Sequence, residues 1–104
     1  MTELEARRRL ASEAAHAVAE ARPLNVPRLL ELLDRHEVDP RCYDLRGSNA
    51  GEQYVVDHSS PRGWSVHYAE RGLRSGERWF NTEADALADL AYRVLRDPTT
   101  RRRA

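Results

Sequence analysis

The sequence predicts an α+β domain with two N-terminal helices, a four-stranded antiparallel meander and a C-terminal helix packed on one sheet face. Apolar residues recur with helical spacing before residue 37 and after residue 82, and they alternate with polar residues over most of the chain between. Segments rich in glycine, proline and serine separate these blocks. One antiparallel sheet, with its apolar face covered by helices, is the economical packing for that order.

The first helix is expected over residues 2–21. Thr2 and Glu5 have the spacing of a capping box, and Pro23 ends the helix. Its apolar stripe is shallow and rich in alanine, so the helix should lie close against another element. The stripe comprises Leu10, Ala14, Ala17, Val18 and Ala21.

The second helix is expected from about residue 26. Asn25 is the predicted N-cap, and Pro27 falls in the first turn, where proline is tolerated. The helix should stop near Glu37, before Pro40. Its broad apolar face comprises Leu29, Leu30, Leu32 and Leu33.

The strand region begins at Cys42. The predicted strands are "CYDLRG", "EQYVVDHS", "GWSVHYAE" and "ERWFN", which begin at residues 42, 52, 63 and 77. The predicted connections are "SNAG", "SPRG" and "RGLRSG", which begin at residues 48, 60 and 71 and have turn composition. The third strand alternates most regularly, so Ser65, His67 and Ala69 should lie on the face opposite Trp64, Val66 and Tyr68.

The last helix starts after Thr82, the predicted N-cap, with Asp85 at the third position. Leu87, Leu90, Ala91, Val94 and Leu95 form its stripe. We expect a core in which this stripe meets the sheet residues Trp64, Val66, Tyr68 and Phe80. The domain should span residues 1–97, and residues 98–104 should form a flexible basic tail.

Composition restricts the function. The chain has 104 residues, and 17 arginines, with no lysine, balance 17 acids. Net charge zero argues against a nonspecific polyanion binder. The arginine bias fits either codon usage in a GC-rich bacterial genome or selection for bidentate contacts. Without a signal peptide, a membrane span or a second cysteine beside Cys42, the chain is expected in the cytoplasm.

Catalytic and metal-binding patterns are missing from the sequence. The four histidines are scattered over different elements, and there is no paired cysteine or HExxH motif, so we expect no metal and no cofactor. "DHSS", which begins at Asp57, contains the letters of a triad, but adjacent strand residues point apart. Cys42 is interpreted as a small buried residue. The chain is therefore expected not to be an enzyme.

Five residues of the last hairpin are left without a predicted packing or capping role: Glu70, Arg71, Arg74, Glu77 and Trp79. Charges of balanced sign beside exposed aromatic residues suit a specific protein interface, in which arginine and tryptophan often carry the binding energy. We therefore predict these five as partner-binding residues. In the alternative interpretation, Trp79 is buried under the N-terminal helices and the ions are merely solvated.

A small sheet-based nucleic-acid-binding domain is the alternative function. Three strands followed by a helix loosely resemble plant ethylene-response-type and integrase arm-type DNA-binding domains, and the element order is similar to double-stranded-RNA-binding domains. However, residues 41–80 carry six arginines and five acids, so the sheet is nearly neutral. Glu83 and Asp85 also occupy the positive end of the last helix, where they would repel a phosphate.

The segments "WSVHYAERG" from Trp64, "FNTEADA" from Phe80 and "YDLRG" from Tyr43 resemble small bacterial immunity proteins of polymorphic-toxin and contact-dependent inhibition systems. The resemblance covers roughly residues 40–97. It implies a noncatalytic cytosolic protein that binds and neutralises one cognate toxin domain. The N-terminal helical pair lies outside it.

Overall fold

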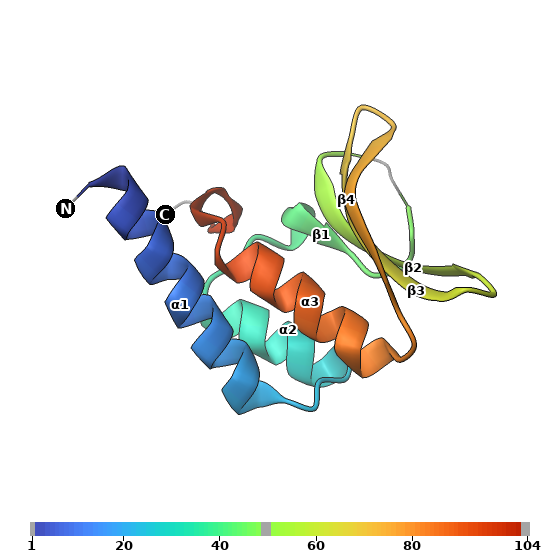
Figure 1. Cartoon of the computed structure of the whole chain (residues 1–104), viewed down its shortest axis with the longest axis horizontal. Helices are drawn as coiled ribbons and strands as arrows, with labels where there is room; N and C mark the ends of the chain where they lie inside the picture. Colours follow the sequence, from blue (N-terminus) through green and yellow to red (C-terminus); the bar gives the residue numbers. More distant parts are fainter. Residues whose placement is uncertain (1, 49–50, 103–104) are drawn as a thin grey trace.

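The computed structural model describes residues 2–48 and 51–102 and has an α+β architecture, as predicted, with three α-helices and a four-stranded mixed sheet (Figure 1). Two short 3-10 helices, η1 and η2, complete the described elements. The bounds are α1 Glu3–Ala21, α2 Val26–Arg35, η1 Pro40–Cys42, β1 Tyr43–Asp44, β2 Gln53–Ser60, β3 Gly63–Glu70, β4 Leu73–Phe80, α3 Glu83–Leu95 and η2 Pro98–Thr100.

All three predicted helix N-caps are confirmed. The Thr2 hydroxyl accepts a hydrogen bond from the Glu5 N–H at 3.1 Å, and the Thr82 hydroxyl accepts one from the Asp85 N–H at 3.2 Å. The Asn25 side chain accepts from the Arg28 N–H at 2.9 Å. Each cap satisfies one of the N–H groups that have no partner within the first helical turn.

The sheet is mixed, so the predicted antiparallel meander is wrong at its first strand. The strand order is β1-β2-β3-β4, and β1 runs parallel to β2, with Tyr43 opposite Tyr54. The Asp44 carboxylate accepts from the Ser48 N–H at 2.6 Å and closes a turn directly after β1. Because β1 and β2 run in the same direction, the start of β2 lies beside the start of β1. Part of the predicted "SNAG" turn, residues 49–50, lies outside the described residues.

The β3–β4 hairpin is tighter than the predicted six-residue connection. Arg71 and Gly72 both have positive φ, at 53° and 80°, so these two residues alone make the turn and β4 begins at Leu73. A two-residue turn of this kind matches the twist of the flanking strands. The pairing then shifts by one residue between Val66 and Tyr68, and Gly76, with φ 65°, lies in the bulge.

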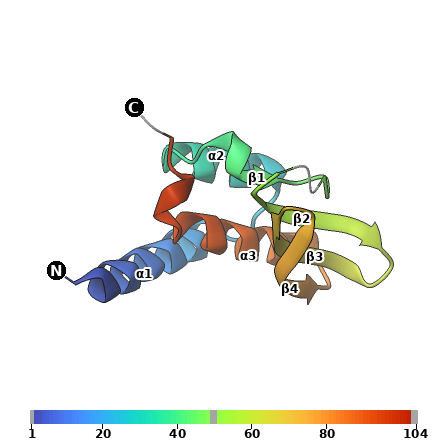
Figure 2. The same cartoon turned by 90° about the horizontal axis from the view of Figure 1, so that it is seen from above.

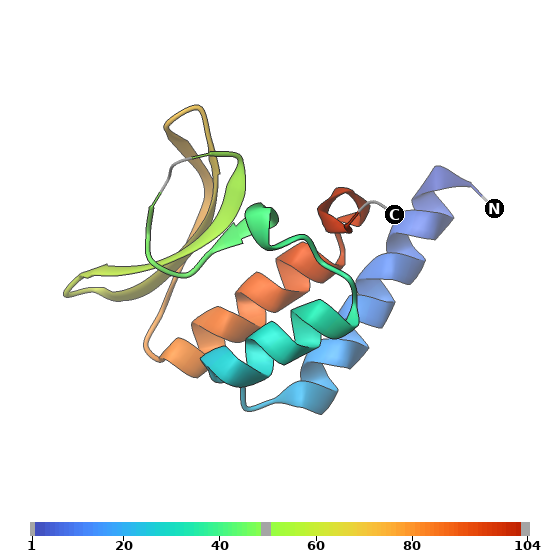
Figure 3. The same ribbon diagram turned by 180° about the vertical axis from the view of Figure 1, so that it is seen from behind.

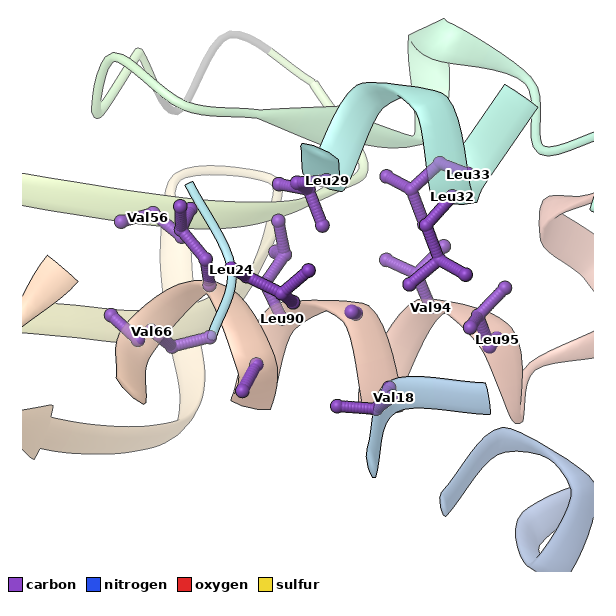
Figure 4. Packing of buried hydrophobic residues seen from close by; sticks show 14 of the residues in the cluster. Val18, Leu24, Leu29, Leu32, Leu33, Val56, Val66, Leu90, Val94 and Leu95 are labelled. Carbon is purple, nitrogen blue, oxygen red and sulfur yellow. The ribbon is translucent and has the colours of Figure 1, made fainter. Parts of the chain in front are cut away.

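The core lies between the sheet and α3, and it continues between α3 and the other two helices (Figure 4). Helix α3 contacts β2, β3 and β4, and α1 packs on α3 (Figures 1 and 2). Figure 3 shows α2 alongside α3 from behind. The predicted core is confirmed for Val66 and for Leu87, Leu90, Val94 and Leu95 of α3, all buried.

The large aromatic side chains occupy the border of this core. Trp64 and Phe80 are half-buried and pack against the buried cluster. Tyr68 is not a member of that cluster, which corrects its predicted place. Its ring instead makes an edge contact with Tyr54, at a centroid distance of 4.9 Å. Tyr54, opposite Tyr68 in the register, packs on the core.

The segment after α3 is folded against the domain as far as residue 102, which differs from the predicted flexible tail. Thr100 is buried and donates a hydrogen bond to the Val94 carbonyl at 2.9 Å. The Asp39 N–H donates to the Thr100 carbonyl, and the Arg102 N–H donates to the Glu37 carbonyl, each at 2.7 Å. These bonds attach residues 98–102 to the chain that follows α2. Residues 103–104 lie outside the described residues.

Within residues 2–48 and 51–102, no helix has the length and apolar character needed to cross a membrane.

Candidate partner-binding surface

The five predicted partner-binding residues lie on β4 and in the turn before it. β4 is an edge strand, because β3 is its one pairing partner among the strands that the structure describes. Glu70 and Arg71 are exposed at the hairpin turn, and Trp79 is half-buried near the other end. At about 3.3 Å per residue, Arg71 and Trp79 are separated by roughly 26 Å. The structure therefore distributes the five residues along an edge rather than gathering them in one compact patch.

Arg74 and Glu77 meet in the middle of this edge. The Arg74 guanidinium donates to Glu77 Oε2 at 2.8 Å and to Asp57 Oδ2, on β2, at 3.2 Å. His67 Nδ1 of β3 lies 3.8 Å from the same Glu77 oxygen. We call these four residues the ion cluster. It joins β2, β3 and β4 on the sheet face that α3 does not cover.

The bulge at Gly76 explains why Arg74 belongs to this cluster. On a regular strand, Arg74 would share a face with Phe80, since their numbers differ by an even count. In the structure, Arg74 is opposite Ala69 and Trp79 is opposite Ser65, and Ser65 and Ala69 share a face of β3. The extra residue of the bulge therefore places Arg74 and Trp79 on one face, opposite Phe80.

Burial and charge set the ionisation of the cluster. Burial alone would raise the pKa of the Asp57 carboxyl, but hydrogen bonds from Ser59 and Arg74 hold that pKa below its usual range. Burial, reinforced by the Arg74 charge, lowers the pKa of His67, against the opposite influence of Glu77 and Asp57. At neutral pH the cluster thus contains a neutral His67 imidazole and an ionised Asp57 carboxylate beside the Arg74 guanidinium.

The segment after β1 explains why this polar face is buried. Gly47 has φ 74°, and a Cβ built on it would lie 2.8 Å from Asp57 Cγ. The backbone at Gly47 therefore lies directly against the Asp57 side chain, which is only 11% exposed, and His67 is fully buried. Sequence analysis considered Asp57 only as part of a rejected triad and predicted neither its role in the ion cluster nor this contact. A carboxylate directly after the apolar pair Val55 and Val56 was the available signal.

The hairpin turn carries an exposed apolar residue that sequence reasoning missed. Leu73 is 74% exposed and pairs with Glu70 across the turn. Arg71 and Glu70 beside it are also exposed. The six-residue connection assumed from sequence hid Leu73 in a loop, whereas the two-residue turn makes it the first residue of an edge strand.

The opposite end of the sheet contains both tryptophans. The Arg62 guanidinium lies 4.5 Å from the centroid of the Trp79 ring, and the His58 ring stacks on Trp64 at 3.7 Å. Trp79 is on the face away from α3, so the interpretation that buried it under the N-terminal helices is wrong. Arg62 and His58 were not predicted as neighbours of these rings.

Other reactive groups are separate from this edge. Cys42 is half-buried, and burial, with Asp39 and Asp97 nearby, raises the pKa of its thiol. A thiol in that state is a poor nucleophile. Among the residues that the structure describes, no group of three or more His, Cys, Asp or Glu side chains could hold a metal ion.

No protein-family model matches the sequence. Neither a curated protein nor a solved structure matches it.

Proposed function

We propose that this chain is a noncatalytic cytoplasmic immunity protein, which binds a cognate bacterial toxin domain along the β4 edge and neutralises it. The observation that carries the proposal is Leu73, which is 74% exposed at the start of an edge strand and has charged neighbours of both signs. An exposed apolar side chain surrounded by balanced ions is typical of a specific protein interface.

The edge offers two kinds of contact to such a partner. At the hairpin turn, Leu73 supplies an apolar contact, and Glu70 and Arg71 supply charges. At the other end, Arg62 stacked on Trp79 presents a guanidinium and an indole together. Arginine and tryptophan are frequent among the interface residues whose truncation causes the largest loss of binding free energy.

The ion cluster argues against the nucleic-acid alternative. Arg74 is the central cation of the edge, and it already donates to both Asp57 and Glu77. Two carboxylates with one guanidinium leave this part of the sheet with an excess of negative charge. A phosphate backbone requires the opposite sign.

The test begins by searching the genes adjacent to this one for a toxin domain, and then measures binding of that domain by calorimetry with purified proteins. Leu73→Asp should weaken binding by about tenfold or more, since it places a charge where the interface buries an apolar side chain. Leu30→Asp, on α2, is the matched control, because Leu30 is another exposed leucine, far along the chain from β4. Wild-type affinity in Leu73→Asp together with weakened binding in Leu30→Asp would move the site to the N-terminal helices.

A second variant addresses the rest of the edge. The double substitution Arg74→Ala and Trp79→Ala should also weaken toxin binding, provided that its denaturation curve shows a folded protein. Binding should fall only moderately between low and physiological salt, unlike a phosphate contact. A folded double variant that neutralises the toxin as well as the wild type would contradict the assignment of these two residues.

A further inference from the structure

A cavity lies on the helix side of β4, away from the ion cluster. It has a volume of about 390 Å³ and lies between α3 and strands β2 to β4. Its walls include the rings of Tyr68 and Tyr92, three arginines and one acid; the charged residues are Arg78, Asp89, Arg93 and Arg96. Cavities of this size accommodate small ligands.

The charges in this cavity are unbalanced. The Asp89 carboxylate lies 2.8 Å from Arg93 Nε and 3.7 Å from Arg78 Nη1. One carboxylate thus faces three guanidinium groups, in a protein whose total charge is zero. Arg93 and Asp89 are each only 12% exposed, so water screens their charges less than it would screen those of exposed side chains.

Arg96 is the cation available to a ligand. Within residues 2–48 and 51–102, its guanidinium has no carboxylate within 4 Å. It lies instead 5.1 Å from the centroid of the Tyr92 ring. A guanidinium held over a ring, and not paired with an acid, retains its hydrogen-bond donors for an oxyanion.

The β4 bulge brings the strand against this group of cations. A Cβ built on Gly76 would lie 3.4 Å from Arg93 Nη1, and the residue has φ 65°. Most other side chains at this position would be strained and would crowd Arg93. The glycine therefore keeps the backbone of β4 close to the guanidinium and leaves the space beside it open.

We propose that this cavity binds a small organic anion in which a phosphate group is attached to a flat ring. The phosphate group would be held by Arg96 and Arg78, and the ring would lie against Tyr68, because the Arg96 guanidinium already lies over Tyr92. Guanidinium groups match the geometry of phosphate oxygens, and an aromatic side chain binds a flat ring by stacking. The site uses none of the proposed toxin-binding residues, although Leu73 lies on the same face of β4 as Arg78.

The experiment uses the full chain at low ionic strength and two probes, inorganic phosphate and phenyl phosphate. Binding is followed by NMR chemical shifts of the Gly76 amide and of the tyrosine ring protons. Phenyl phosphate should bind about tenfold more tightly than inorganic phosphate, because stacking adds to the ionic contact. Absence of any shift with either probe at ten millimolar would overturn the proposal.

Three variants test the roles of the residues. Arg96→Gln should weaken both probes by about tenfold, which corresponds to the loss of one charged contact. Arg71→Gln, at the distant hairpin turn, should change neither affinity. Tyr68→Leu should remove the preference for phenyl phosphate while inorganic phosphate still binds. Equal affinities in wild type and Arg96→Gln, or equal losses in Arg96→Gln and Arg71→Gln, would show nonspecific ion binding and contradict the site.

Discussion

The two faces of β3 are both buried, but they are stabilised by different physics. The face toward α3 presents Val66 to an apolar cluster, whereas the opposite face presents Ser65 and the fully buried His67 to charged neighbours. The first face depends on removing apolar surface from water, which varies little with pH or salt. The second depends on ion pairs and on the protonation of an imidazole, so solution conditions should change it. The alternation of side chains along β3 therefore places two independent sources of stability on its two faces.

Truncation of the apolar face should give the largest effect. Leu90→Ala removes a fully buried side chain from the centre of α3, and it should lower the free energy of unfolding by about 3 kcal/mol. Chemical denaturation measures the change, and Leu30→Ala, at an exposed leucine, is the control. An unchanged denaturation midpoint in Leu90→Ala would show that the helix face is assigned wrongly.

Truncation of the polar face should be less costly. Asp57→Ala removes the acceptor of hydrogen bonds from Arg74 and from the Ser59 N–H, which should lower the free energy of unfolding by about 2 kcal/mol. Arg74 keeps Glu77 as a partner, which limits the loss. Asp34→Ala, in an exposed pair with Arg102, is the control and should cost less than about 1 kcal/mol. Equal losses of unfolding free energy in the two variants would show that the contacts of Asp57 stabilise the fold no more than an exposed surface ion pair does.

A decrease in pH should weaken the contribution of the polar face to stability and leave that of the apolar face unchanged, without any mutation. The folded pKa of His67 lies below the ordinary 6.5, so the unfolded chain binds a proton that the folded chain does not. Stability should therefore fall as the pH drops from about 7 through 6.5 toward the folded pKa of His67. Asp57, with its lowered pKa, adds a second loss as the pH falls below about 4.

NMR titration of the imidazole protons checks the first part directly. The His67 resonance should titrate below pH 6.5, and the slope of unfolding free energy between pH 7 and 6 should decrease in His67→Gln. His36, whose pKa is also lowered by burial, remains in that variant and gives the residual slope. A His67 midpoint at or above 6.5 would contradict the assigned environment.

The smallest effect is expected outside both faces. Leu73→Thr changes a side chain that is exposed at the hairpin turn, so the free energy of unfolding should change by less than about 0.5 kcal/mol. Thermal denaturation measures it. A loss comparable to that of Asp57→Ala would mean that Leu73 is buried in solution, and it would remove the main support for a binding role at this turn.

Local signals predicted the helices well. Caps depend on residues three positions apart, as at Thr82 and Asp85, and the α3 stripe shows a full helical period. The direction of β1 was not predictable in this way, because a two-residue strand has no periodicity. Its parallel pairing is set by the segment that leads back to β2.

The candidate site was predictable only in part. The sequence indicated that Trp79 and Phe80 point to opposite faces of β4, which the register confirms. It could not place Arg74 beside Asp57, because the turn that sets Arg74 opposite Ala69 was not predicted, and the bulge interrupts the alternation between Arg74 and Phe80. Nor did it show the two-residue turn, since Arg71 adopts a left-handed backbone conformation that is uncommon for arginine. In both places one backbone dihedral decided which side chains meet.

The bulge at Gly76 acts as a phase shift in the alternation of β4. The two-residue turn fixes the pairing of Leu73 and Arg74, so the residues before Gly76 keep their orientation whatever follows. Deletion of Gly76 would remove the extra residue and restore a regular ladder in which Trp79 still faces Ser65 and Phe80 still faces Trp64. A regular strand that kept Gly76 would instead invert the residues after it, sending Phe80 to the polar face and Trp79 toward α3. A shift of the pairing by one residue at this position would thus exchange the inside and the outside of half a strand, whereas a substitution elsewhere on β4 alters only one side chain.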